Sequence, residues 1–197
     1  MSNHPRLESW VHSVWSHRGP VACLLYPLSL IYQAVSASRR RRTVANHLPV
    51  PVVVVGNIYV GGTGKTPVTI ALVRALRARG WTPGVISRGF GRSEDGVRLV
   101  TPDSDAAQVG DEPLLIARES LAPVAVGRER VKAGLELLRE HPGVNIIISD
   151  DGLQHAALAR DVELAVIGAR GLGNGWLLPA GPLREPVSRL DDVDAII

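Results

Sequence analysis

The sequence has a single cysteine, Cys23, among its 197 residues. One cysteine cannot form a disulfide within the chain, and it cannot build a cysteine-based metal site, so both kinds of scaffold are excluded. The scarcity of cysteine suits a reducing compartment. Because Cys23 lies in an apolar run, its plainest interpretation is a small buried hydrophobic residue.

Acidic residues are nearly missing from the N-terminal part of the chain. Residues 1–47 hold six arginines against one acid, Glu8, and this segment carries the basicity behind the net charge of +3. No charged residue occurs between Gly19 and Ser38, and four arginines follow at 39–42. An apolar helix beside arginines gains from hydrophobic burial and from attraction to anionic lipid. We therefore predict that residues 1–47 form a helical arm that lies on a membrane surface.

Other interpretations of the arm stay open. Twenty uncharged residues are long enough to span a bilayer, although Pro27, Ser29 and Gln33 dilute their hydrophobicity. The triplet at 35–37 resembles a signal-peptide cleavage site, but four arginines after an apolar core favour retention in the cytoplasm. The segment could also be a packed helix of a soluble protein that is followed by a solvated linker.

The rest of the sequence has no internal repeat and no low-complexity tract, and apolar strand patterns alternate with helical ones. This alternation predicts an α/β fold of the P-loop NTPase kind, with a mostly parallel sheet and helices on both faces. We expect one globular domain over 48–197, preceded by the arm over 1–47. Strands are expected at 52–55, 85–87, 97–100 (as part of a hairpin), 123–126, 144–149 and 162–167, and helices at about 65–80, from 110 and at 131–138.

A glycine-rich loop follows the first predicted strand. Its glycines let successive N–H groups turn toward phosphate oxygens, and the following helix adds the positive end of its dipole. In such a loop Lys65 reaches the β- and γ-phosphates and the Thr66 hydroxyl ligates Mg²⁺. The loop is a variant, because the usual spacing requires glycine at the position of Tyr59. A plain glycine turn is the alternative, but it has no use for that lysine and hydroxyl. The predicted nucleotide-binding residues are Tyr59, Val60, Gly61, Gly62, Thr63, Gly64, Lys65 and Thr66.

A second polar segment, Ser149-Asp150-Asp151-Gly152-Leu153-Gln154-His155, ends the apolar strand predicted at 144–149. Crossovers in a parallel sheet bring the carboxyl ends of its strands to one edge, beside the phosphate loop. A carboxylate there can hold Mg²⁺ or its waters, and we assign this role to Asp150. Asp151 shares the metal or hydrogen-bonds the neighbouring loop. The alternatives are a simple turn for Asp-Asp-Gly and a structural hydrogen bond for His155.

Asp111 occurs at the start of a predicted helix, in the stretch Gly110-Asp111-Glu112-Pro113. An aspartate before a proline at a helix start is a normal N-cap. The same carboxylate could act in a catalytic site. The residues alone leave both interpretations open.

Six blocks of the sequence together resemble the tetraacyldisaccharide 4′-kinases of lipid A biosynthesis. In order they are GNIYVGGTGKTP at 56–67, SRGFG at 87–91, VGDEP at 109–113, GRER at 127–130, SDDGLQH at 149–155 and GNGWLLPAGPLREP at 173–186. The resemblance implies a kinase that uses ATP and Mg²⁺ to phosphorylate the 4′-hydroxyl of a tetraacylated glucosamine disaccharide 1-phosphate. It also implies that the protein is located at the cytoplasmic face of the inner membrane of a Gram-negative bacterium. The family typically lacks the glycine that Tyr59 replaces.

The resemblance also implies roles for individual residues. Asp111 matches the residue proposed to accept the proton of the attacking sugar hydroxyl, and Lys65, Thr66 and Asp150 match phosphate and metal contacts. The expected partners are the lipid A disaccharide precursor and an anionic membrane surface, with no nucleic acid and no obligate protein partner. The loop from 171 to 186 is expected to border the lipid. Supporting roles are expected for Glu112, Asp151, Gln154, His155, Arg88, Arg128, Arg130 and Arg184. For each of the four arginines, a solvated position on the surface is the alternative.

Family members continue into a further lobe, so the resemblance implies that this chain, which ends at Ile197, is incomplete and lacks a histidine partner of Asp111. Two other functions remain open. One is a P-loop ATPase switch, although such proteins usually place a lysine where this chain has Val60. The other is a nucleotide-binding module without kinase activity.

Overall fold

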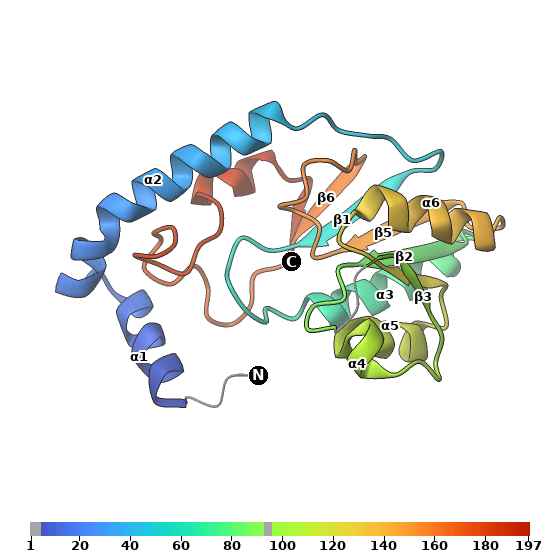
Figure 1. The fold of residues 1–197 in the computed structure, drawn as a ribbon, viewed down its shortest axis with the longest axis horizontal. Coiled ribbons are helices and arrows are strands. Elements are labelled where there is room, and N and C mark those ends of the chain that lie inside the picture. The colour runs from blue at the N-terminus through green and yellow to red at the C-terminus, as the bar shows by residue number, and fades with distance from the viewer. Residues whose placement is uncertain (1–4, 93–95) are drawn as a thin grey trace. The chain divides into compact units, whose positions relative to one another are not determined.

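The structure is a computed structural model that describes residues 5–92 and 96–197 (Figure 1). The first four residues of the predicted arm lie outside this description. The chain forms two compact units. We call Val44–Asn57, Gly64–Val166 and Val193–Ile197 the sheet unit, and Met1–Thr43, Ile58–Thr63 and Ile167–Asp192 the arm unit. These units do not follow the predicted boundary at residue 47, because the arm groups with two later segments. A functional division into 1–47 and 48–197 stays a prediction.

The sheet unit contains one seven-stranded sheet in the order β3-β4-β2-β5-β1-β6-β7. All neighbouring strands are parallel except β3 and β4. The strand predicted at 97–100 is therefore present, but its assignment to a hairpin is wrong: β3 pairs with β4, and two helices separate them in sequence. The strands are β1 (Val52–Gly56), β2 (Pro83–Ser87), β3 (Arg98–Val100), β4 (Val124–Val126), β5 (Ile146–Asp150), β6 (Val162–Ala165) and β7 (Ala195–Ile196).

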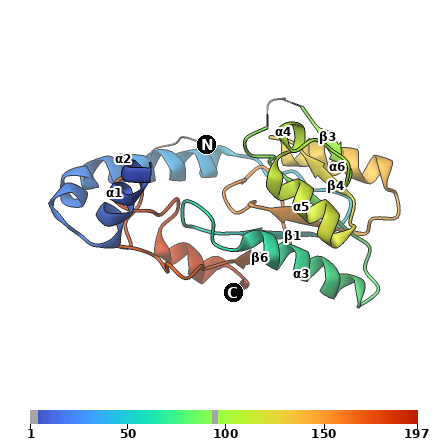
Figure 2. The ribbon, with the colours of Figure 1, turned by 90° about the horizontal axis from the view of Figure 1, so that it is seen from below.

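Helices cover both faces of this sheet, as predicted. Helix α3 (Lys65–Arg77) packs on β1, β2 and β5 and contacts α5 (Asp111–Ser120). Helix α6 (Arg130–Glu140) packs on β2 and β4 from the other face (Figures 1 and 2). A short helix, α4 (Ala106–Val109), precedes α5 and contacts it.

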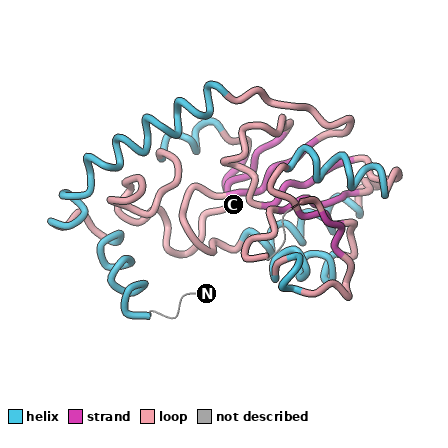
Figure 3. Tube along the Cα trace, viewed as in Figure 1, coloured by secondary structure: helices cyan, strands magenta, loops and turns pink. Residues whose placement is uncertain are grey.

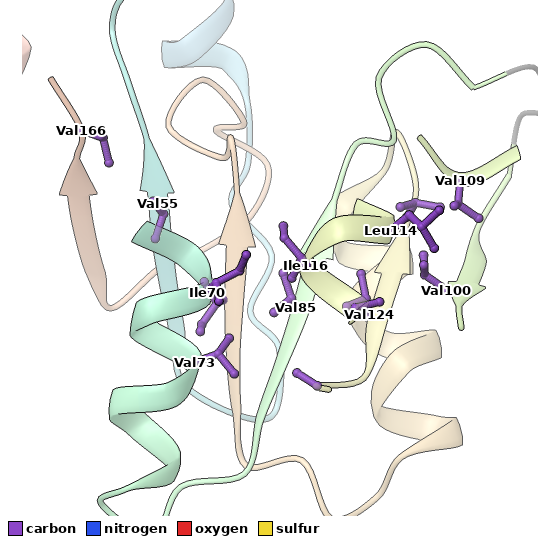
Figure 4. Close-up of a cluster of buried hydrophobic side chains, with 14 residues drawn as sticks. Val55, Ile70, Val73, Val85, Val100, Val109, Leu114, Ile116, Val124 and Val166 are labelled. Carbon is purple, nitrogen blue, oxygen red and sulfur yellow. The ribbon is translucent and has the colours of Figure 1, made fainter. Parts of the chain in front are cut away.

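The core of the sheet unit lies between the sheet and the helices α3 and α5 (Figure 4). The central strands β1 and β5 are buried along their whole length, because helices or loops cover them on both faces. Complete burial of one Val or Ile side chain stabilises the fold by roughly 1.5–3 kcal/mol. The strand ends that carry the predicted site are thus anchored in the best-packed part of the chain.

The arm unit is built from helices and long loops (Figure 3). It contains α1 (Pro5–Ser16), α2 (Pro20–Arg42) and a 3₁₀ helix, η1 (Val187–Asp192). Arginines fill the last turn of α2, where they complement the helix dipole. By length and composition α2 is the one described helix that could cross a membrane, which is weak evidence by itself. The expectation that Cys23 is buried is wrong, because it lies on an exposed face of α2.

Candidate functional site

The glycine-rich loop connects β1 to α3. Gly64 is the N-cap of α3 and has a φ of 85°, a left-handed conformation that glycine adopts without steric cost. No side chain caps this helix. The N–H groups of Lys65 and Thr66 are therefore not used by a capping side chain, Pro67 has no N–H, and the helix dipole adds positive potential there.

Tyr59, which replaces the usual glycine, is buried in the arm unit. Its side chain is 6% exposed and belongs to an apolar cluster with Ile58, Leu177 and Leu183. A glycine could not make these contacts. The side chain at this position therefore anchors the first half of the loop. Because Leu177 is buried as well, packing within the arm unit accounts for part of the apolar character of the 171–186 loop. Contact of this loop with the lipid stays a prediction.

Lys65, the first residue of α3, forms an ion pair with Asp151. Its Nζ lies 3.6 Å from Oδ1 of Asp151, and the lysine side chain is only 10% exposed. Asp151 has a φ of 49°, which is uncommon for a residue other than glycine. This conformation turns the chain directly after β5. The predicted phosphate-binding lysine and the second aspartate of the SDDGLQH block are thus brought together.

Asp150 is the last residue of β5 and pairs in register with Val55 of β1. It is 1% exposed, and both of its carboxylate oxygens accept a hydrogen bond. Thr69 Oγ1 donates to Oδ1 over 3.2 Å, and Ser87 Oγ donates to Oδ2 over 3.3 Å. Neither donor was predicted from the sequence. The signals were present, since Thr69 lies one turn beyond Thr66 on α3 and Ser87 is a polar end to an apolar strand.

Burial raises the pKa of Asp150 to about 6, and the nearby carboxylates of Asp151 and Glu112 add to this effect. Lys65 and the hydrogen bond from Thr69 act in the opposite direction. A bound cation would favour the ionised form.

The described residues include no group of three or more His, Cys, Asp and Glu side chains arranged to hold a metal ion. One fixed carboxylate with a nearby hydroxyl instead suits Mg²⁺, which keeps several waters and binds through one or two carboxylates plus substrate phosphates. Asp150 fits that description, and Thr66, the second residue of α3, stays the predicted second ligand.

Asp111 is the first residue of α5 and is exposed. Its alternative interpretation as an N-cap is wrong, because Gly110 occupies that position and no side chain caps the helix. A Cβ atom at Gly110 would lie 3.1 Å from the carbonyl oxygen of Phe90, so the start of α5 lies directly against the loop after β2. The SRGFG and VGDEP blocks, 20 residues apart in sequence, therefore meet in the fold.

The four predicted arginines have different surroundings. Arg130 is 3% exposed, and its Nη1 donates to the carbonyl oxygen of Gly127 over 2.9 Å. Burial lowers its pKa to about 10, against the opposing effects of Asp151 and Asp150. Its buried Nε has no hydrogen-bond partner among the described residues. Arg88 is exposed but close enough to influence Arg130, Arg128 is exposed, and Arg184 belongs to the arm unit.

His155 and Gln154 lie in the loop after Asp151. Burial and the charges of neighbouring arginines, Arg130 first, together lower the pKa of His155 to about 4. The imidazole is therefore neutral at pH 7. Gln154 Nε2 donates to the carbonyl oxygen of Asn57 over 2.9 Å, which ties this loop to the residue after β1.

Arg160 holds the loop that carries these residues, a role that was not predicted from the sequence. Its guanidinium donates to the carbonyl oxygens of Leu153, His155 and Leu158, over 3.2, 2.5 and 3.1 Å respectively. It also pairs with Glu163 of β6 over 2.9 Å. No local sequence pattern marks an arginine of this kind, because its partners are backbone atoms.

Comparison with known proteins gives a consistent result. Residues 21–197 match the family described as tetraacyldisaccharide-1-P 4′-kinase, LpxK. The tetraacyldisaccharide 4′-kinase of Dechloromonas aromatica is 58% identical over 194 residues, which are 97% of this chain and 58% of that protein. That of an Acidovorax species is 59% identical over 192 residues, 95% of this chain and 57% of that protein.

A solved structure is also similar. The crystal structure titled the "apo" form of LpxK from Aquifex aeolicus in complex with ATP shares 32% identity and gives a TM-score of 0.80. It covers 89% of this chain, which matches 58% of that one. This chain thus spans somewhat over half the length of the relatives it matches. The P-loop NTPase-like fold and the resemblance carried by the six sequence blocks are both confirmed, and the chain belongs to the tetraacyldisaccharide 4′-kinase family.

Proposed function

We propose that the protein transfers the γ-phosphate of ATP to the 4′-hydroxyl of a tetraacylated glucosamine disaccharide 1-phosphate, a precursor of lipid A. In this proposal the present chain supplies the nucleotide-binding part. The carrying observation is the placement of Lys65 and Asp151 in one ion pair beside the fixed carboxylate of Asp150, at the ends of the neighbouring strands β1 and β5. Family membership and the ATP complex of the Aquifex aeolicus relative support it.

Phosphoryl transfer depends mainly on positioning and on neutralisation of charge. The loop from 59 to 66 would hold the phosphates through N–H groups other than that of Val60, which donates to the carbonyl oxygen of Pro182. Lys65 would exchange its contact with Asp151 for the β- and γ-phosphate oxygens. Arg130, buried close enough to Asp150 and Asp151 for their charges to affect its pKa, would add positive charge near the transferred group. Arg88 lies close enough to Arg130 and His155 for its charge to lower their pKa values, whereas roles for Arg128 and Arg184 rest on the resemblance alone.

Thr66 and Asp150 would hold Mg²⁺, which when bound supplies neutralising charge to the phosphates. The hydroxyls of Thr69 and Ser87 keep the carboxylate of Asp150 in one orientation, so that no rearrangement is needed when the metal arrives. Glu112 adds negative potential at the same place, because it is close enough to raise the pKa of Asp150.

Asp111 would accept the proton of the attacking hydroxyl. Its exposed position at the first residue of α5 leaves it accessible to an acceptor. Asp151, Gln154 and neutral His155 would line the site through hydrogen bonds.

We also propose that α2 rests on the cytoplasmic face of the inner membrane. Four apolar side chains at positions i, i+4, i+7 and i+11 form one exposed stripe of this helix, which we call the outer stripe: Leu24, Leu28, Ile31 and Val35. Such a stripe beside arginines matches an interfacial helix. Arg40 pairs with buried Glu185, so attraction to anionic lipid would fall to the other three arginines of the run.

An acceptor-dependence assay on the full-length protein tests the proposed reaction. ATP consumption should require the lipid disaccharide, and the product should carry one new phosphate at the 4′-position. Equal ATP hydrolysis without the acceptor would instead identify an ATPase switch. Nucleotide binding without turnover under both conditions would identify a binding module.

A further inference from the structure

We propose that helix α2 positions the first half of the phosphate loop, Ile58–Thr63, and that Ser29 is the positioning residue that joins the helix to it. The connection runs through the loop over 174–185, and every contact in it lies within the arm unit. The proposal deepens the proposed function, because it assumes that this loop binds a nucleotide.

The first contact is made by Ser29, which is 2% exposed. Its hydroxyl donates to the carbonyl oxygen of Leu177 over 2.8 Å and accepts from the N–H of Ala180 over 3.0 Å. Both hydrogen-bonding functions of a buried hydroxyl are thus used on one short segment. In the sequence Ser29 only interrupts an apolar run. In the fold it is the polar residue of the helix face that packs inward.

The second step is the turn that this hydroxyl holds. The N–H of Gly181 donates to the carbonyl oxygen of Leu177 over 2.9 Å, and the N–H of Leu178 donates to that of Leu183 over 2.9 Å. Asn174 Nδ2 also donates to the carbonyl oxygen of Ala180 over 2.9 Å. The segment 177–183 is therefore closed on itself, and a shift at Leu177 or Ala180 is passed on to Leu183.

The third step is the pairing of this turn with the phosphate loop. The N–H of Val60 donates to the carbonyl oxygen of Pro182 over 2.9 Å, and the N–H of Arg184 donates to that of Ile58 over 2.7 Å. Tyr59 lies opposite Leu183 in an antiparallel bridge, and both are buried in the cluster that includes Ile58. Residues 58–60 thus have their backbone fixed by the turn that Ser29 holds. The chain runs from there into Gly64 and Lys65.

Helix α2 holds the far end of the same segment as well. Tyr32 Oη donates to the carbonyl oxygen of Arg184 over 3.2 Å. Arg40 forms an ion pair with Glu185. Glu185 also forms one with Arg189, whose Nε lies 3.4 Å from Oε2 of Glu185. The side chains of Glu185 and Arg189 are 4% and 9% exposed, so this pairing is largely shielded from solvent. A loop that is held in shape before its ligand arrives loses less conformational entropy on binding, which favours affinity.

Three serine variants of the full-length protein test the proposal. Ser29→Ala removes both hydrogen bonds, Ser29→Thr keeps a hydroxyl, and Ser36→Ala makes the same chemical change two turns further along α2. Affinity for Mg·ATP should weaken roughly tenfold in Ser29→Ala, as expected for two lost hydrogen bonds, while kcat at saturating ATP changes little. Ser29→Thr should recover most of this affinity, and Ser36→Ala should match the wild type.

Amide hydrogen exchange without nucleotide gives a readout that a general loss of stability would not reproduce. In Ser29→Ala the N–H of Val60 should exchange about tenfold faster than in the wild type. The N–H of Ile147 in β5, which donates to the carbonyl oxygen of Pro51, should exchange at an unchanged rate. Unchanged exchange at Val60 together with unchanged affinity would overturn the proposal. So would equal acceleration at Val60 and Ile147, which marks a merely structural serine.

A milder variant keeps the test decisive if Ser29→Ala does not fold. Tyr32→Phe deletes one hydroxyl and should weaken affinity and speed exchange at Val60 two- to threefold; no change in either would count against the coupling. If the wild type does not bind Mg·ATP, the proposed function fails, while the exchange data still decide whether α2 holds the loop.

Discussion

Each of the two units of the chain is stabilised internally by a different kind of interaction. In the sheet unit, apolar strands and helices bury a large common core, and the polar residues of the site project from the strand ends. In the arm unit the apolar cluster is small, and hydrogen bonds from α2 to backbone atoms about 150 residues away do much of the fixing. Apolar packing is non-directional, whereas a hydrogen bond fixes the positions of two particular atoms. We therefore expect the sheet unit to set the chemistry and the arm unit to set the shape of the loop.

The strongest test of the sheet unit is Lys65→Ala. ATP turnover should fall to background, because the lysine provides charge to the phosphates and not packing to the core. Its thermal unfolding should stay close to that of the wild type. Lys132→Ala is the matched control, since that lysine is 67% exposed on α6. Wild-type turnover in Lys65→Ala would contradict the assignment of the loop.

A second test concerns Asp111. Asp111→Asn should lower kcat by roughly 10²–10⁴, the usual effect of losing a positioned general base, and leave Mg·ATP affinity nearly unchanged. Asp150→Asn should differ, because loss of a metal ligand weakens metal-dependent nucleotide binding before any chemistry. Kinetics and binding isotherms on the full-length variants separate the two. A normal kcat in Asp111→Asn would leave this residue only its favourable interaction with the dipole of α5.

A third test uses the raised pKa of Asp150, about 6 in the folded chain against 3.8 for an ordinary aspartate. A carboxyl with a raised pKa binds its proton more tightly in the folded state. Its contribution to stability is therefore full below pH 3.8 and is lost as the pH rises through 6. Without Mg²⁺, Asp150→Asn should be more stable than the wild type by roughly 2–3 kcal/mol at pH 8 and about equal to it at pH 4.

Urea unfolding at pH 4, 6 and 8, without added metal, measures this difference. Asn can keep hydrogen bonds with both Thr69 and Ser87, so the comparison isolates the buried charge. A stability difference between Asp150→Asn and the wild type that does not change with pH would show that ionisation of Asp150 does not destabilise the fold. The same variant would then be expected to lose function without gaining stability.

The smallest expected effects are those on the outer stripe of α2. Leu28→Ser should weaken binding to anionic vesicles by up to about tenfold, and Arg41→Gln by about fivefold, with the second effect disappearing at high salt. Co-sedimentation with vesicles measures both. Ser36→Ala, on the half-buried side of the helix, is the control. Point variants are preferable to deletion of residues 1–47, because deletion would also remove Ser29 and Tyr32 from the arm unit.

Unchanged vesicle binding in Leu28→Ser and in Arg41→Gln would contradict the interfacial role of α2. The arm would then serve only to hold the 174–185 loop. If both variants bind vesicles weakly but keep wild-type Mg·ATP affinity, the outer stripe and the inward face of the helix act independently.

The sheet and the polar strand ends could be predicted because their causes are local. Runs of Val and Ile mark buried strands, and parallel connections place the residues after each strand at one edge. Lys65, Asp150 and Asp151 were therefore expected close together, and they are. Arg160 was not expected, since its main partners are backbone atoms that no spacing rule identifies. Thr69 and Ser87 were not expected either, although the helical spacing from Thr66 and the polar end of β2 marked them.

The sequence by itself determined where the glycine-rich loop lies, which segments form strands and helices, and to which family the chain belongs. These features depend on glycine positions, apolar periodicity and the spacing of sequence blocks, all of which are local patterns along the chain. Only the tertiary structure decided which polar residues face which. It placed Ser29 inward on a helix that composition marks as apolar, it made Tyr59 an anchor where a glycine is usual, and it excluded Asp111 as an N-cap. The physical reason is that burial and hydrogen-bond partners depend on segments distant in sequence, which meet only when the chain is folded.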